Sequence, residues 1–157
     1  MLATGLLAGA AGTLALDIYT YADIFSSARP PSTLPATTVQ KLAQGMGLSA
    51  LASDDEAAAN RRNGAGALLG YGVGLGAGVG YAAVRPAFEG WLPWPIAGVL
   101  LGASTLIVSE GAANALGATD WSEWTSSEWL ADIIPRTLYG LIVAYVCENL
   151  GEEETTA

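Results

Sequence analysis

Apolar residues dominate four long stretches of the chain, and polar residues gather between them. The stretches cover residues 2–22, 64–84, 94–116 and 129–149. A helix needs about 20 apolar residues to cross the hydrocarbon core of a bilayer. The pattern therefore predicts an all-α bundle of four transmembrane helices, forming one integral membrane domain over residues 1–157. Two alternatives remain open: a soluble alanine-rich helical bundle, and a β structure, because the glycines between residues 70 and 80 also alternate with a period of two.

Glycine recurs at every fourth position in the second stretch. Gly66, Gly70, Gly74 and Gly78 form one ladder, and Gly72, Gly76 and Gly80 form a second one, about 200° away around the helix. The pairs Gly5 and Gly9, and Gly98 and Gly102, offer small-residue faces on the first and third helices. In a bilayer, small residues four apart let helix backbones approach closely. We expect glycine-zipper packing with the second helix at the centre and close neighbours on both of its faces; a homo-oligomer interface is the alternative.

The connections between the stretches carry further structural signals. In loop 23–63 an apolar i, i+3, i+4, i+7 pattern predicts a short amphipathic surface helix with Val39, Leu42, Ala43 and Met46 on one face. Ser53 with Glu56, and Thr125 with Glu128, have the spacing of a capping box, which marks the start of a helix. The short proline-rich turn after residue 85 predicts that the second and third helices form an antiparallel hairpin.

Charged residues are few and mostly acidic, with 6 Lys and Arg against 15 Asp and Glu and a formal net charge of −9. Lys and Arg concentrate in the cytoplasmic loops of membrane proteins. Arg29, Lys41, Arg61 and Arg62 all fall in loop 23–63. We therefore expect loops 23–63 and 117–128 to be cytoplasmic. Both termini, including the acidic tail 150–157, should lie on the outer side of the cell membrane. The acidic exterior disfavours nucleic acid as a partner and leaves the lipid bilayer, a second copy or another membrane subunit.

Few residues suit conventional catalysis. The chain has no histidine and one cysteine, Cys147, so the usual general base and a thiolate zinc site are missing. No phosphate-binding glycine loop or G-x-S-x-G motif is present. A magnesium site at Asp120, Glu123 and Glu128 is less favoured than a solvated acidic surface. We expect no enzyme activity, no cofactor and no metal.

Four ionisable residues lie inside the predicted spans at a similar depth, namely Asp17, Glu110, Asp132 and Arg136. A charge near the centre of a membrane helix costs about 2.5 to 3.5 kcal/mol, which makes these residues a candidate ion or proton site. In that interpretation Arg136 pairs with one carboxylate while another binds or relays a proton or cation. In the structural alternative Asp17 lies at a wet helix end, Glu110 caps a neighbour, and Asp132 with Arg136 is an interfacial i, i+4 pair.

Three segments resemble a family of small, uncharacterised four-helix membrane proteins common in actinobacteria. The segments are residues 9–23 (GAAGTLALDIYTYAD), 29–32 (RPPS) and 116–140, which contains LGATDWSEW and WLADIIPRTLYG. The resemblance implies an integral membrane protein and no known activity. In that family a histidine often follows the proline of the last helix, where this chain has Arg136, so the resemblance implies no shared titrating site.

Two functions follow from these observations. The first is a structural or accessory membrane subunit, or homo-oligomer, that uses its glycine faces for assembly. The second is a small proton or cation transporter or channel that uses the four ionisable residues.

Overall fold

Every element that the structure describes is helical. The computed structural model describes the backbone of residues 1–88 and 90–156 and the side chains of residues 1–88 and 90–150. The elements are α1 (Leu2–Ser27), α2 (Leu34–Met46), α3 (Ser49–Ala52), α4 (Glu56–Val84), η1 (Arg85–Ala87), α5 (Trp94–Ala115), η2 (Trp121–Glu123) and α6 (Ser126–Thr156). The all-α prediction is confirmed for these residues, and the β alternative is wrong.

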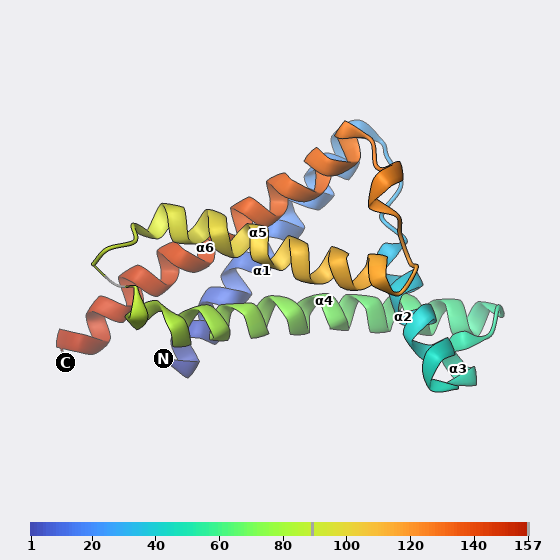
Figure 1. Ribbon diagram of the computed structural model, residues 1–157, viewed down its shortest axis with the longest axis horizontal. Helices are drawn as coiled ribbons and strands as arrows, with labels where there is room; N and C mark the ends of the chain where they lie inside the picture. The colour runs from blue at the N-terminus through green and yellow to red at the C-terminus, as the bar shows by residue number, and fades with distance from the viewer. Residues whose placement is uncertain (89, 157) are drawn as a thin grey trace.

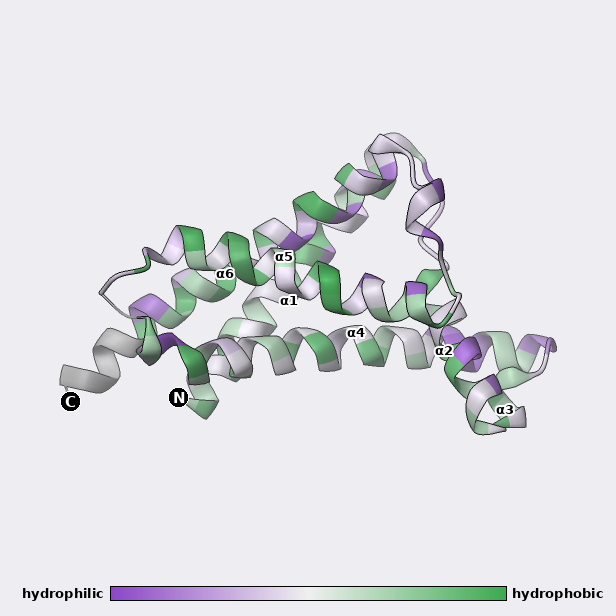
Figure 2. Cartoon of the chain, viewed as in Figure 1, coloured by the Kyte–Doolittle hydropathy of each residue, from purple (hydrophilic) through white to green (hydrophobic). Residues whose placement is uncertain are grey.

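Four of the described helices are long and apolar enough to cross a membrane. They are Leu2–Ser27, Glu56–Ala87, Trp94–Ala115 and Ser126–Leu150. Figure 2 shows apolar residues along these helices and strongly hydrophilic ones mainly near their ends and around α2 and α3. Large apolar side chains are exposed on all four, as at Leu14, Leu68, Ile107 and Leu130. Such a surface is unusual for a soluble monomer.

The long helices pack in series, in the order α4, α1, α6, α5. The closely packed pairs are α4 with α1, α1 with α6, and α6 with α5, whereas α4 touches α5 and α6 only slightly. In Figure 1, α1 and α6 run antiparallel as a diagonal pair, and α4 and α5 run across this pair, with α4 below α5 in that view. Both termini and the α4–α5 connection share one end of the molecule.

One prediction about the second long helix is therefore wrong, because α4 is not central. α4 does run antiparallel to α5, as predicted, but the two helices touch only slightly. The reason lies in the glycines of α5. Gly98 and Gly102 approach the backbone of α6, where Gly140 offers a matching small residue, and so α5 packs on α6 instead of α4.

Glycines mark the places where helix backbones come closest. A Cβ atom on Gly78 of α4 would lie 2.5 Å from the carbonyl oxygen of Gly5 and 2.6 Å from the Cα atom of Gly9, both in α1. A Cβ atom on Gly98 of α5 would lie 2.9 Å from the carbonyl oxygen of Gly140 in α6. No side chain larger than hydrogen fits at these positions without moving a backbone.

The apolar core lies near the end that carries the termini. The buried side chains there come mainly from α6, with Tyr139, Val143, Ala144 and Cys147. Tyr139 also donates a hydrogen bond from its hydroxyl to the carbonyl oxygen of Gly74, at 2.6 Å, which links α6 to α4 across α1. At the same end Arg85 pairs with Glu148, with Nη2 and Oε2 2.8 Å apart.

The first long connection folds against the beginning of α4. Val39 and Ala43 of α2 are buried, and a Cβ atom on Gly66 of α4 would lie 2.9 Å from the backbone carbonyl carbon of Pro35. The other two residues of the predicted apolar face, Leu42 and Met46, are exposed.

Capping residues set where two of the long helices begin. The Thr125–Glu128 capping box is confirmed: the Thr125 amide donates to Glu128 Oε2 at 2.7 Å, and the Glu128 amide to Thr125 Oγ1 at 3.4 Å. The Ser53 box is wrong, because Asp55 is the N-cap of α4 and its Oδ1 accepts from the Ala58 amide at 2.8 Å. The Ser53 hydroxyl donates to Asp55 instead. This hydrogen bond and the one from the Ala58 amide stabilise the carboxylate and lower the pKa of Asp55.

We predict that Gly78→Ala destabilises the protein by about 1 to 3 kcal/mol, because the new methyl group overpacks the α1–α4 contact. Gly76→Ala is the matched control, since a Cβ atom there would meet nothing within 4 Å. Unfolding of both variants in a detergent that keeps the chain monomeric, followed by circular dichroism, measures the difference. Equal stabilities would contradict the close contact at Gly78.

Candidate functional site

Three of the four ionisable residues predicted for the site form one cluster between α5 and α6. Arg136 of α6 donates from Nη2 to Oε1 of Glu110 in α5. Asp132, one turn before Arg136, places Oδ2 3.4 Å from Arg136 Nε. The side-chain exposures are 7% for Glu110, 17% for Arg136 and 28% for Asp132. We call these three residues the carboxylate–arginine cluster.

The close packing of α5 and α6 positions this cluster. A Cβ atom on Gly102 would lie 2.5 Å from the carbonyl oxygen of Arg136, so the two backbones are close at the residue that carries the guanidinium. Glu110 lies about two turns further along α5, within reach of the long arginine side chain. Gly102, which lets the two helices approach, therefore also places the Arg136 side chain within reach of Glu110.

Asp17, the fourth predicted residue, has a different partner. Its Oδ2 atom accepts a hydrogen bond from the Tyr71 hydroxyl at 3.2 Å, which joins α1 to α4. The sequence places all four residues at a similar depth, but depth does not determine which helix face each one occupies. In the structure Glu110, Asp132 and Arg136 are in contact, whereas Asp17 forms a hydrogen bond with Tyr71.

Unpartnered polar atoms gather around the cluster. Among the described side chains, the buried nitrogen and oxygen atoms without a hydrogen-bond partner are Glu110 Oε2, Asp132 Oδ2, Arg136 Nε and Trp121 Nε1. Trp121 lies in η2, and its ring would be 3.6 Å from a Cβ atom on Gly111, the neighbour of Glu110. The path of the α5–α6 connection places Trp121 beside α5.

Three tryptophan rings pack edge-on or tilted at the α5–α6 connection, and acidic residues there accept local hydrogen bonds. The ring of Trp129 lies 6.0 Å from that of Trp121 and 4.9 Å from that of Trp124, between centroids. Asp120 accepts hydrogen bonds from the Ser122 hydroxyl and amide, which lower the pKa of Asp120. Two of the acidic residues considered for magnesium, Asp120 and Glu128, thus act as local caps.

The predicted packing glycines divide into two groups. A Cβ atom would come within 3.0 Å of another helix at Gly5, Gly9, Gly66, Gly74, Gly78, Gly98 and Gly102. It would meet nothing within 4 Å at Gly70, Gly72, Gly76 and Gly80. Three of the four residues of the first ladder thus face α1 or α2, while the second ladder is in close contact with no other helix.

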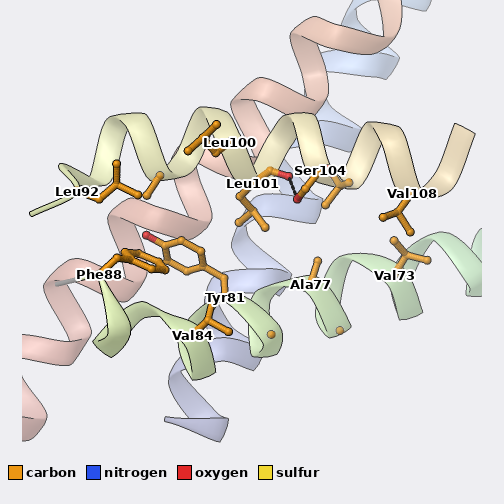
Figure 3. A pocket seen from close by; sticks show the side chains of 14 residues that line it. Val73, Ala77, Tyr81, Val84, Phe88, Leu92, Leu100, Leu101, Ser104 and Val108 are labelled. Atoms are coloured by element: carbon orange, nitrogen blue, oxygen red, sulfur yellow. Dashed lines mark hydrogen bonds between the residues drawn. The ribbon is translucent and has the colours of Figure 1, made fainter. Parts of the chain in front are cut away.

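An apolar groove of about 810 Å³ lies between α4 and α5. Figure 3 shows Val73, Ala77 and Val84 on α4 opposite Leu100, Ser104 and Val108 on α5, with Phe88 and Leu92 near one end. The hydroxyl of Ser104 donates to the Leu101 carbonyl at 2.7 Å, and that of Thr105 donates to the Gly102 carbonyl at 2.8 Å. Both hydroxyl groups thus donate to their own helix, and none of the described residues that line the groove is charged.

Comparison with known proteins gives no match to a protein-family model, to a curated protein or to a solved structure. The resemblance to the actinobacterial membrane proteins therefore stays a prediction.

We predict that Arg136→Gln destabilises the protein by about 3 to 5 kcal/mol, because it removes the cationic partner of the buried Glu110 and of the partly exposed Asp132. Arg29→Gln is the control: it breaks the more exposed Arg29–Asp23 pair and should cost less than about 1 kcal/mol.

The double variant Glu110→Gln with Arg136→Gln completes a mutant cycle for this pair. It should recover part of the stability that the arginine substitution removes, since the two residues are in contact. Equal losses for Arg136→Gln and Arg29→Gln in chemical unfolding would contradict the buried pair.

Proposed function

We propose that the protein is a structural or accessory membrane subunit located in the cell membrane. It associates with a second copy of itself through the open glycine face of α4, formed by Gly72, Gly76 and Gly80. The observation that carries this proposal is the division of the two ladders. Gly74 and Gly78 approach α1, whereas Gly72, Gly76 and Gly80 are open. Small residues in a membrane helix favour association because they let another backbone come close. The open ladder offers that surface without a partner inside the monomer.

The size of the groove beside this ladder suits a helix. Gly76 and Gly80 line it, and on α4 it extends from Val73 to Val84. Eleven residues at 1.5 Å each span about 16 Å, or three helical turns. Glycine-zipper packing would thus act twice in α4, once within the monomer and once between copies.

A second copy suits this face better than an unrelated helix. Two copies in one bilayer have the same orientation, so a two-fold axis along the membrane normal brings each residue of α4 near its equivalent at the same depth. Gly72, Gly76 and Gly80 would then face the same three residues of the second copy. A face of small residues is complementary to itself, which an isologous interface requires.

A small proton or cation transporter is the second candidate, and the buried carboxylate–arginine cluster favours it. The position of Asp17 argues against the four-residue pathway on which that function was based. Asp17 hydrogen-bonds Tyr71 on the α1–α4 side, while the other three residues lie between α5 and α6. We therefore prefer the assembly role.

Cysteine cross-linking in native membranes tests the proposed interface. Cys147 is the only cysteine, so Cys147→Ala provides a cysteine-free chain. Into it we would introduce Gly72→Cys, Gly76→Cys or Gly80→Cys. We predict that oxidation yields a disulfide-linked dimer in at least one of these three variants, since equivalent positions meet near the two-fold axis.

Leu14→Cys is the control, because this side chain is 61% exposed on α1 and lies outside the groove. It should stay monomeric under the same oxidation. Dimer yields from all three glycine positions that do not exceed the yield from Leu14→Cys would contradict the interface.

A further inference from the structure

The carboxylate–arginine cluster is incomplete in its hydrogen bonding. The Glu110 side chain is 7% exposed, and its Oε2 atom has no hydrogen-bond partner, although its Oε1 atom accepts from Arg136 and from Ser109. Asp132 Oδ2 likewise makes no hydrogen bond, although Arg136 Nε lies 3.4 Å from it. An ionised carboxylate is an acceptor at both oxygens, and leaving one buried without a donor is costly. Glu110 and Asp132 thus each keep one buried oxygen atom without a hydrogen bond.

The charges of the cluster do not balance if both acids are ionised. Glu110 and Asp132 then contribute two negative charges, and Arg136 contributes one positive charge. An uncompensated charge among spanning helices is expensive, whereas a neutral and hydrogen-bonded group costs far less. One added proton makes the cluster neutral, with one carboxylic acid, one carboxylate and one guanidinium. It also supplies the missing donor.

Other ionisable groups around the cluster do not supply this compensation. From α6 the groups that act on Glu110 are Asp132 and Arg136, and its own helix contributes the neutral Ser109 hydroxyl. Asp17 of α1 is held by Tyr71, and Asp120 of the α5–α6 connection by Ser122. Among the remaining cations, Arg29 and Arg85 pair with Asp23 and Glu148. The single guanidinium of Arg136 thus faces two carboxyl groups.

We propose that Glu110 and Asp132 together bind one exchangeable proton, which makes this cluster a one-proton site within the helical bundle. Because both acids contact Arg136, we assign the proton to the cluster and not to one residue. Asp132, the most exposed member, is the point of exchange with water, and Glu110 is the buried member. This inference does not rest on self-association, because the cluster lies between two helices of a single chain.

Infrared spectroscopy of the full-length protein in lipid bilayers tests the proposal through the carbonyl stretch of a protonated carboxylic acid. We expect a band at neutral pH that corresponds to one acid per chain and shifts in heavy water. Glu110→Gln and Asp132→Asn should each abolish this band, because either substitution leaves one carboxylate opposite one guanidinium. Arg136→Gln should increase the band.

Asp17→Asn is the matched control and should leave the band unchanged, since Asp17 lies outside the cluster. Circular dichroism of each variant checks that the helices are retained. A wild-type protein without the band at neutral pH would overturn the proposal. So would a band that survives in folded Glu110→Gln and Asp132→Asn proteins. The infrared band does not depend on whether α4 forms cross-linked dimers. Either proposal can therefore be contradicted while the other stands.

Discussion

Direct backbone contact between helices at glycine is the constraint on which this bundle depends. α1 meets α4 where Gly5 and Gly9 face Gly78, and α5 meets α6 where Gly98 and Gly102 face Gly140. Because lipid tails are as apolar as leucine, burial of apolar surface does not hold helices together in a bilayer, and close contact does. Tyr139 and Val143 of α6 then pack against Gly12 of α1 and join the two pairs.

This serial packing determines both functional proposals. α1 and α6 occupy the middle, so α4 and α5 lie on their flanks and leave an apolar groove between them. The same close approach of α5 and α6 brings Arg136 to Glu110. A side chain larger than hydrogen at Gly102 would separate the two helices and with them the ion pair. The groove and the carboxylate–arginine cluster thus both arise because α5 packs on α6 and not on α4.

The sequence predicted the elements well and their neighbours poorly. Hydropathy found the four long helices because length and apolar composition are local properties, and the Thr125–Glu128 cap was recognisable for the same reason. Glycine spacing showed that α4 has two small-residue faces, but it carries no information about which helix meets each face. The true partner of Gly98 and Gly102 is Gly140, a lone glycine that belongs to no ladder.

The candidate site shows the same division. Depth along each helix placed four ionisable residues at one level, but it did not tell which of them meet. Glu110, Asp132 and Arg136 are in contact, whereas Asp17 is turned toward Tyr71. Depth along a helix could not identify Trp121, because the path of the α5–α6 connection brings this residue beside Gly111. Rotation of a helix about its axis is a tertiary property, and one sequence does not fix it.

The central claim is that α4 has one face packed within the monomer and one face free for a second copy. Counting subunits by single-molecule photobleaching of labelled protein at low density in bilayers tests it most directly. The account predicts two subunits per particle for the wild type and one for Gly76→Leu, a substitution into open space that leaves the monomer folded. A wild-type protein that bleaches in one step at every protein-to-lipid ratio would contradict it.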